Sequence, residues 1–363
     1  MQVTIIGLPA SGKTTVFNAL TGVQAETGFG GGRAAPNLAV VKVPDERLDR
    51  LAELYHPRKA TPADVTYADV AIPAGAAGEG TAAPDLLAQV RNADALVHVL
   101  RAFDDGGADR PADPWRDLEE LDLEYAVADL GVVQKRLEKL RTSGRHGSPA
   151  ERDANALEEA LLERIEPHLA EGHPLRSLAL EDDEEKRLRG YRFLTQKPVL
   201  LLVNLEEGRL ADAKRIEEEG RTRYGGPQVT VVALAGKLEA EIAQLSPEDA
   251  GPFLEDLGIP EASRGRVIRL TYALLGLFSF FTAGEDECRA WTLRTGATAV
   301  DAAAAIHSDL ARGFIRAEVV TFEDLMACGS TAEARRRGLL RSEGKAYEVK
   351  DGDVIEVLFN VAR

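Results

Sequence analysis

The sequence predicts an α/β protein organised around a doubly wound, mostly parallel β-sheet. Short apolar, β-branched segments alternate along the chain with longer segments of helical periodicity. The first apolar segment, 2–6, ends at a glycine and is followed by a glycine-containing turn and then by an amphipathic run from residue 16. Strands that alternate with helices are joined by crossovers, and this connectivity favours a parallel sheet.

The turn after the first strand carries the pattern Gly-x-x-x-x-Gly-Lys-Thr from residue 7 to residue 14. Between a strand and a helix, this pattern predicts the P-loop of a P-loop NTPase (G-domain) fold. Glycines let the backbone curl so that its N–H groups point at phosphate oxygens, and the helix N-terminus adds partial positive charge. The residues expected to contact the nucleotide here are Leu8, Pro9, Ala10, Ser11, Gly12, Lys13, Thr14 and Thr15.

Two side chains of this loop are assigned catalytic roles. Lys13 is expected to reach the β- and γ-phosphates, and the Thr14 hydroxyl is expected to ligate Mg²⁺. The alternative is a glycine-rich turn with an unrelated lysine, and the flanking strand and helix argue against it.

The other elements of the sheet follow in chain order. Strands are expected over 38–43, 65–70, 95–100, 198–203 and 229–233, with helices over 44–54 and 86–93. The strand 65–70 carries Asp69 near its end, beside the predicted mouth of the P-loop. A carboxylate there holds Mg²⁺, often through water, and the alternative is an aspartate that caps the next element.

The strand 198–203 is followed by Asn204-Leu205-Glu206-Glu207. An asparagine at this strand end can bond the base and brace the P-loop, whereas a simple helix cap is the alternative. Guanine-specific GTPases have Asn-Lys-x-Asp at this point. Here Leu205 replaces the lysine and Glu207, longer by one methylene, replaces the aspartate, which weakens the case for guanine. Ala235 and Gly236 follow the strand 229–233, where a base-stacking loop is expected.

The chain between the strands at 95–100 and 198–203 is longer than one crossover requires. Two apolar stripes at helical spacing flank a break at 143–149 and predict an inserted helical hairpin, a coiled coil, within 121–195. Two helices packed flat on the sheet are the alternative. The stripes consist of Leu123, Val127, Leu130, Val133, Leu137 and Leu140, and of Leu157, Leu161, Ile165 and Leu169.

The pattern changes after about residue 278. Strands are expected over 289–294 and 317–321, a helix over 298–312, and two strands around the Asp-Gly turn within 347–359. These elements predict a compact α+β module at 279–363, separate from the nucleotide-binding domain at 1–120 and 196–278.

Composition limits the classes of function. The 363 residues are 44% hydrophobic and 29% charged, as is usual for a globular protein. The presence of just two cysteines suits a reducing cytoplasm. No signal peptide is expected, because the first strand begins at residue 2. No membrane span is expected either, because the sequence has no run of about 18 apolar residues. The net charge of −16 argues against indiscriminate binding to nucleic acid, and DNA is not an expected partner. His98 is expected to be a core residue.

Taken together, these residues resemble the YchF / Obg-like ATPase family of translation-factor-related P-loop GTPases. The resemblance runs from the P-loop through Asn204-x-x-Glu207 to the C-terminal module, where it is most specific. The matching stretches there are Phe281-Thr-Ala-Gly284, Arg289-Ala-Trp-Thr292, Gly296-Ala-Thr-Ala299, Gly313-Phe-Ile-Arg-Ala317 and Asp351-Gly-Asp-Val354.

The resemblance implies three parts: a G domain, an inserted helical hairpin and a C-terminal TGS domain. It also implies a cytoplasmic ATPase that prefers ATP to GTP, uses Mg²⁺ and associates with ribosomes, ribosomal RNA or translation factors. The chain departs from the family at Ile72-Pro73, where the family has a glycine, and at Arg33, which occupies the position of a switch threonine. Arg33 could instead approach the γ-phosphate as an arginine finger does.

Three functional hypotheses follow. The first is a slow ATPase that acts as a nucleotide switch on the translation machinery, with turnover raised by a partner. The second is a nucleotide-binding ribosome or RNA adaptor with weak or no hydrolysis, which Ile72-Pro73 and Arg33 favour. The third is a GTPase. Basic clusters in the last third of the chain, among them Arg335-Arg336-Arg337, could meet RNA phosphates, with solvated surface charge as the alternative.

Overall fold

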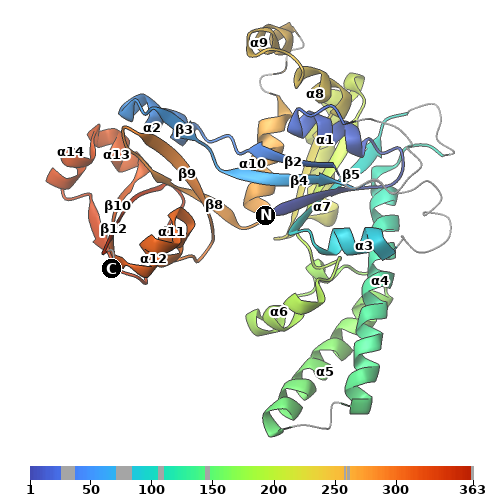
Figure 1. The fold of residues 1–363 in the computed structure, drawn as a ribbon. Coiled ribbons are helices and arrows are strands. Elements are labelled where there is room, and N and C mark those ends of the chain that lie inside the picture. Colours follow the sequence, from blue (N-terminus) through green and yellow to red (C-terminus); the bar gives the residue numbers. More distant parts are fainter. Residues whose placement is uncertain are drawn as a thin grey trace. The chain divides into compact units, whose positions relative to one another are not determined.

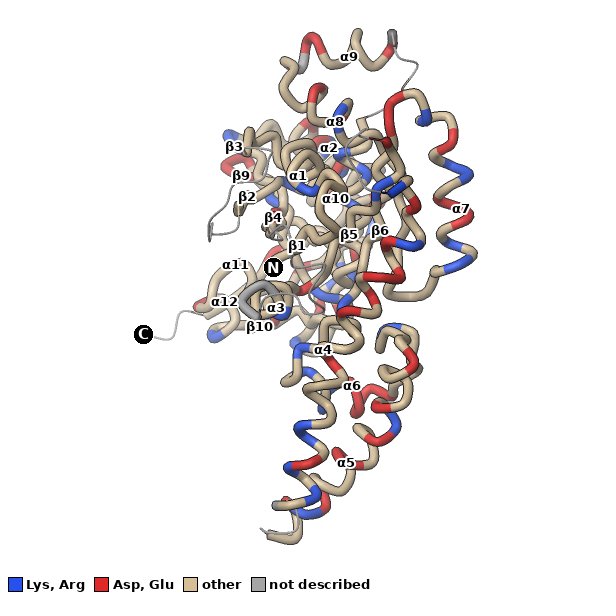
Figure 2. The backbone as a smooth tube through the Cα atoms, turned by 90° about the vertical axis from the view of Figure 1, so that its right-hand side faces the viewer, with Lys and Arg blue, Asp and Glu red and all other residues tan. Residues whose placement is uncertain are grey.

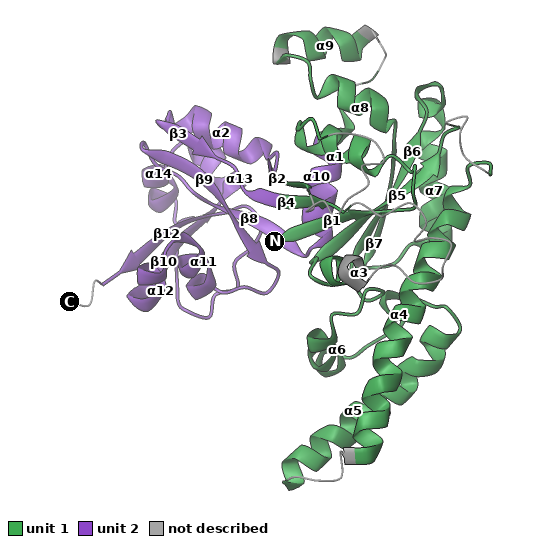
Figure 3. Ribbon diagram, turned by 45° about the vertical axis from the view of Figure 1, so that its right-hand side comes forward, with its two compact units in different colours: residues 1–39, 66–264 green, residues 40–65, 265–363 purple. Residues whose placement is uncertain are grey.

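The computed structural model describes residues 1–25, 37–70, 84–104, 110–143, 148–256, 259 and 262–360, and Figure 1 shows the fold. The chain divides into two compact units, coloured in Figure 3. Unit 1 comprises residues 1–39 and 66–264, and unit 2 comprises residues 40–65 and 265–363. The described part of the chain contains no helix with the length and hydropathy of a membrane span.

Unit 1 is built on a six-stranded sheet with the order β2-β4-β1-β5-β6-β7. The pairs β4-β1, β1-β5, β5-β6 and β6-β7 are parallel, and helices lie on both faces (Figure 1), so the predicted doubly wound sheet is confirmed. The strands are β1 (Gln2–Ile6), β2 (Asn37–Lys42), β4 (Asp64–Asp69), β5 (Ala95–Ala102), β6 (Val199–Leu205) and β7 (Val229–Leu234).

The helices of this unit include those that the periodicity predicts. They are α1 (Lys13–Thr21), α3 (Pro84–Arg91), α4 (Pro114–Ser143), α5 (Pro149–Ala170), α6 (Asp182–Leu188), α7 (Ala213–Tyr224), α8 (Gly236–Ile242), α9 (Pro247–Asp256) and α10 (Ser263–Leu274), which continues into unit 2. The short 3₁₀ helices are η1 (Leu175–Ser177), η2 (Arg189–Tyr191) and η3 (Glu207–Asp212). All residues of β5 and β6 are buried, as expected for central parallel strands.

The predicted hairpin is present as α4 and α5, which extend away from the sheet in Figures 1 and 2. Ser148 and Glu151 form a capping box at the start of α5. Charged residues of both signs follow one another along the hairpin (Figure 2), as a solvated outer face requires. The apolar core between the helices comprises Ala126, Val133, Leu137, Leu140, Leu161, Leu162, Ile165 and Leu169, together with residues of the segment that follows α5.

The predicted apolar stripes are wrong at three positions. Leu123 and Val127 on α4 and Leu157 on α5 are exposed, at 53%, 52% and 56%. The base of α4 does not face α5, because it packs on the sheet of unit 1 through Leu118, Leu121 and Tyr125. Leu123 and Val127 therefore lie on neither buried face.

Unit 2 has its own six-stranded sheet with the order β11-β10-β12-β8-β9-β3. Its strands are β3 (Lys59–Thr61), β8 (Leu277–Thr282), β9 (Glu287–Arg294), β10 (Phe314–Thr321), β11 (Arg341–Glu343) and β12 (Asp353–Phe359). Its helices are α2 (Glu46–Tyr55), α11 (Ala299–Ile306), α12 (Ser308–Arg312), α13 (Phe322–Cys328) and α14 (Thr331–Arg336). Residues 40–65, expected within the nucleotide-binding domain, are grouped with unit 2, where β3 pairs with β9. The strands at the two ends of this segment, β2 and β4, still pair in the sheet of unit 1.

Two details of the predicted C-terminal module are wrong. The helix expected over 298–312 is interrupted at His307, whose backbone is extended and whose Nδ1 accepts a hydrogen bond from the Asp309 N–H. The expected strand before the Asp-Gly turn does not pair with β12. Instead, the Val349 N–H donates to the Ala297 carbonyl and the Tyr347 carbonyl accepts from the Ala299 N–H, so this segment lies beside the start of α11.

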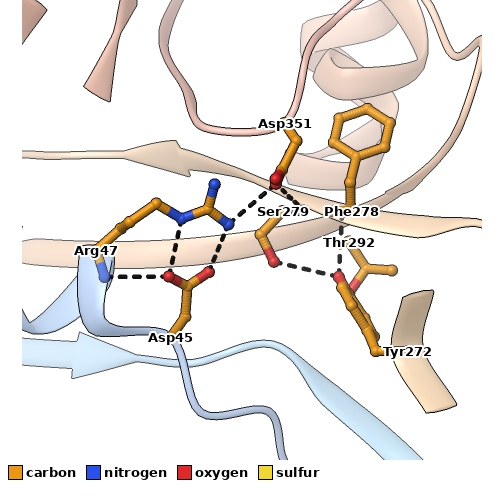
Figure 4. Close-up of polar contacts among 7 residues, drawn as sticks. All are labelled: Asp45, Arg47, Tyr272, Phe278, Ser279, Thr292 and Asp351. Atoms are coloured by element: carbon orange, nitrogen blue, oxygen red, sulfur yellow. Dashed lines mark hydrogen bonds and ion pairs between the residues drawn. The ribbon is translucent and has the colours of Figure 1, made fainter. Parts of the chain in front are cut away.

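A polar network holds residues 45–47 in unit 2, and Figure 4 shows its members. The Arg47 guanidinium donates to both oxygens of Asp45, at 2.9 and 2.8 Å, and to Asp351 Oδ1, at 2.9 Å. It also lies 5.2 Å from the ring centroid of Phe281. Hydrogen bonds to Asp45 and Asp351 raise the pKa of Arg47, so the guanidinium stays protonated. Asp351 in turn accepts the Ser279 N–H, at 3.3 Å.

Replacing Arg47 with alanine is expected to destabilise unit 2 by about 2 kcal/mol, because three charge-assisted hydrogen bonds are lost. The chain has two tryptophans, Trp115 in unit 1 and Trp291 in unit 2. Urea unfolding followed by fluorescence in a Trp115→Phe background therefore reports on unit 2. The control is Arg50→Ala, which removes an exposed arginine of the same helix that lies over the Phe322 ring and forms no ion pair among the described residues. Equal midpoints for the two variants would contradict the role of the network.

Candidate functional site

The P-loop lies at the carboxyl end of β1 with the backbone conformations that the pattern predicts. Gly7 has φ +149° and Gly12 has φ +87°. A Cβ at Gly7 would lie 2.4 Å from the Val99 carbonyl oxygen, and one at Gly12 would lie 2.3 Å from Asn204 Nδ2. Both positions therefore require glycine. Ala10 also has a positive φ, of 61°, at the exposed crest of the loop.

The N-terminus of α1 faces this loop. Gly12 occupies the N-cap position, and no side chain of the described residues caps the helix. The first N–H groups of α1 are thus left to an external acceptor, which is the arrangement that binds phosphate. The Ser11 hydroxyl is buried here and has no hydrogen-bond partner among the described residues.

Lys13 folds back across the loop. Its Nζ donates to the Leu8 carbonyl, at 2.8 Å. Burial lowers the pKa of Lys13 to about 8, and the charge of Asp69 opposes this shift in part. A triphosphate in the loop would supply the negative charge that the buried ammonium lacks.

Thr14 and Asp69 meet at the start of α1 and the end of β4. The Thr14 hydroxyl donates to Asp69 Oδ2, at 2.9 Å, and Asn37 Nδ2 lies 3.5 Å from the same oxygen. Asp69 is 4% exposed, and its Oδ1 has no hydrogen-bond partner among the described residues. A hydroxyl and a carboxylate with a free buried oxygen are a donor set that Mg²⁺ prefers, so these residues could hold the metal.

Asn204, at the end of β6, braces two loops. Its Nδ2 donates to the Ser11 carbonyl, at 3.0 Å, and its Oδ1 accepts the Gly236 N–H, at 2.9 Å. The asparagine thus connects the P-loop with the start of α8. Because both bonds are buried, the two loops are fixed relative to each other.

The other predicted base-contacting residues differ in their placement. Glu207 begins η3 and is exposed, whereas Ala235 is buried at the N-cap of α8 beside Gly236. Leu205 is buried in the core with Trp115 and Leu201, so its side chain does not belong to the loop cluster. Pro9 and Thr15 are half-buried in the P-loop and the first turn of α1. Arg33, Ile72 and Pro73 lie outside the described residues.

The arrangement can therefore do three things chemically. Loop amides and Lys13 can hold the phosphates of a nucleotide, Thr14 and Asp69 can hold a divalent cation, and the loops joined by Asn204 can border a base. These are the parts needed for phosphoryl transfer, in which positioning and charge stabilisation supply most of the catalysis.

Comparison with known proteins gives matches along the whole chain. The family model described as YchF-GTPase_C, Protein of unknown function (DUF933), matches residues 277–360. The Ribosome-binding ATPase YchF of Bacillus subtilis (strain 168) is 38% identical over 366 residues, which cover 98% of both chains. The protein of the same name from Haemophilus ducreyi is 41% identical with the same coverage. This chain belongs to the YchF family.

Structural comparison agrees with membership of the YchF family. The structure of the Schizosaccharomyces pombe YchF GTPase matches with a TM-score of 0.86 and 29% identity, and the match covers 99% of this chain and 97% of that one. The resemblance predicted from the sequence, and the P-loop NTPase fold with it, is thus confirmed.

Two residues beside the site could not be identified as site residues from the sequence. Asn37 lies near Asp69, and Phe103 lies 3.8 Å from where a Cβ would stand on Gly12. Asn37 is the first residue of β2, at the edge of the sheet, and Phe103 directly follows the carboxyl end of β5. These positions are the local indication that the two residues lie near the site. Their role depends on chain segments that meet only in the folded structure.

The depressed pKa of Lys13 predicts that nucleotide affinity depends on pH. With a pKa of about 8 in the nucleotide-free protein, the ammonium form is mostly present at pH 7 and falls to about a tenth at pH 9. Because the triphosphate binds the charged form, affinity for ATP is nearly full at pH 7, is about halved at pH 8 and is about tenfold lower at pH 9. Calorimetry at the two pH values measures this change. A flat profile for the wild type, or an equal decrease in Lys13→Ala, would contradict it.

Proposed function

We propose that this chain is an ATP hydrolase that uses Mg²⁺ and acts as a ribosome-associated nucleotide switch in the cytoplasm. The observation that carries the proposal is the half-buried pair Lys13 and Thr14, with the buried Asp69 bonded to Thr14, at the mouth of a P-loop. The names of the bacterial relatives, Ribosome-binding ATPase YchF, support the substrate and the partner.

In this proposal each residue has one task. The amides of residues 8–15 and the Lys13 ammonium hold the β- and γ-phosphates, and Asn204 keeps the loop in shape. Mg²⁺, when bound by Thr14 and Asp69, neutralises charge that develops on the phosphate oxygens. Water attacks the γ-phosphate, and among the described residues the one carboxylate or histidine hydrogen-bonded to Lys13 or Thr14 is Asp69. Slow turnover without a partner follows from this arrangement.

We assign base recognition to Asn204, Glu207 and the Ala235-Gly236 turn, and we assign ATP as the preferred substrate. Glu207 replaces the shorter aspartate of guanine-specific sites. A GTPase is the second candidate, because the S. pombe relative carries that name. Binding of both purine nucleotides by the same sample distinguishes the two.

We also propose three functional parts: a G domain at 1–120 and 196–278, a helical hairpin at 121–195 and a TGS domain at 279–363. The hairpin and the TGS domain would report nucleotide occupancy to the ribosome. Several basic residues of the C-terminal clusters pair within unit 2, for example Arg335 with Glu318 and Arg336 with Glu333. They are therefore weaker candidates for RNA phosphates than their charge alone suggests.

Phosphate release from ATP, measured with and without ribosomes, tests the proposal. Turnover of the isolated protein should stay well below about 1 s⁻¹ and should rise when ribosomes are added. Sedimentation with ribosomes should differ between ATP and ADP. Binding of ATP without any phosphate release under either condition would leave a nucleotide-dependent adaptor in place of an enzyme.

A further inference from the structure

The segment that carries Glu207 is held in place by a residue outside the predicted site. Glu207 is the first residue of η3, and its side chain is exposed. An exposed glutamate recognises a base well only if its backbone is already fixed. Otherwise the conformational entropy lost when the segment becomes ordered offsets much of the binding free energy. The contacts of η3 therefore determine how well Glu207 can recognise the base of the nucleotide.

Arg209 supplies the first contact. Its Nη1 donates to the Ala102 carbonyl at the end of β5, at 3.1 Å, and its Nε lies 3.4 Å from Asp212 Oδ2 within the same short helix. Ala102 is the register partner of Leu205, which ends β6 just before η3. Arg209 thus ties η3 back to the carboxyl edge of the sheet.

Leu210 supplies the second contact, on the other side. It packs on the apolar cluster of Ala235, Leu238 and Ile242, which belongs to the N-cap and body of α8. Ala235 and Gly236 form the other proposed base loop, and Gly236 is bound to Asn204. Arg209 and Leu210 therefore anchor η3 to β5 and to α8, and Asn204 joins the start of α8 to the P-loop.

We propose that Arg209 is a positioning residue for base recognition: it fixes η3, the short helix that carries Glu207. This rests on the proposed function, since it requires a purine nucleotide in the site. Arg209 acts on the base part of the ligand, because its contacts involve η3 and β5 and none that the structure describes involves the P-loop.

The test compares two probes, Mg·ATP and magnesium tripolyphosphate, which has the phosphate chain but no base. Arg209→Ala should lower the affinity for ATP by about fivefold and leave the affinity for tripolyphosphate unchanged, because one hydrogen bond that orders η3 is lost. Arg209→Lys should recover most of the ATP affinity, since a lysine ammonium can also donate to the Ala102 carbonyl.

The matched control is Arg215→Ala on α7. Arg215 also lies near Asp212, at 3.5 Å, but its described partners do not include Ala102. This variant should bind both probes as the wild type does. If Arg209→Ala weakens both probes equally, or neither, Arg209 is not a positioning residue for the base. If the wild type binds neither probe, the proposed function itself fails, and that outcome is distinct.

Discussion

Replacing Lys13 with alanine should reduce ATP turnover by at least about a hundredfold, as loss of a buried donor to a transferring phosphoryl group does. The side chain is half-buried at the phosphate-binding loop, and its Nζ lies 2.8 Å from the Leu8 carbonyl. A bound triphosphate would replace that carbonyl as the partner of the ammonium. Phosphate release under single-turnover conditions measures the effect on chemistry, separately from product release.

The same variant should fold normally. Burial lowers the pKa of Lys13, which means that the nucleotide-free protein is destabilised by the charged lysine. Lys13→Ala should therefore unfold at an equal or higher temperature than the wild type when no nucleotide is present. Lys214→Ala, an exposed lysine of α7, serves as the control and should change neither turnover nor stability. If Lys13→Ala hydrolysed ATP as fast as the wild type, the P-loop would have no role in hydrolysis.

Replacing Asp69 with asparagine should raise the Mg²⁺ concentration needed for half-maximal turnover by about tenfold or more, since carboxylate charge sets the affinity of such sites. The shape of the side chain is kept, and an amide oxygen can still accept the Thr14 hydroxyl that Asp69 Oδ2 accepts at 2.9 Å. The change therefore removes charge without removing the contact. A titration of phosphate release with MgCl₂ measures it.

Asp64→Asn is the matched control, because it makes the same substitution at the other, exposed end of β4. The Mg²⁺ dependence of this control should equal that of the wild type. If Asp69→Asn also keeps the wild-type dependence, the metal is held elsewhere and the assignment of Thr14 and Asp69 must be abandoned.

Features encoded locally could be predicted from the sequence. The P-loop depends on residues adjacent in the chain, so its pattern alone predicts the roles of Gly7, Gly12 and Lys13. The parallel strands could be predicted for the same reason, since apolar runs such as β5 and β6 are buried throughout. His98 within β5 is buried, as predicted, and burial lowers its pKa to about 3.

Features that depend on distant contacts could not be predicted. The strand β3 has three residues, Lys59–Thr61, with no apolar pattern, and it exists because β9 pairs with it from a remote part of the sequence. Likewise, the exposure of Leu123 and Val127 follows from the base of α4 turning toward the sheet. Arg209 reaches the Ala102 carbonyl across more than a hundred residues of chain.

The most direct test of the central claim is calorimetry of the purified protein with ATP and with GTP in the presence of Mg²⁺. The account predicts saturable binding of ATP at concentrations well below about 1 mM, weaker binding of GTP, and weakened but still measurable binding of both in Lys13→Ala. No binding of either nucleotide at that concentration would contradict the account, because every other assignment depends on an occupied P-loop.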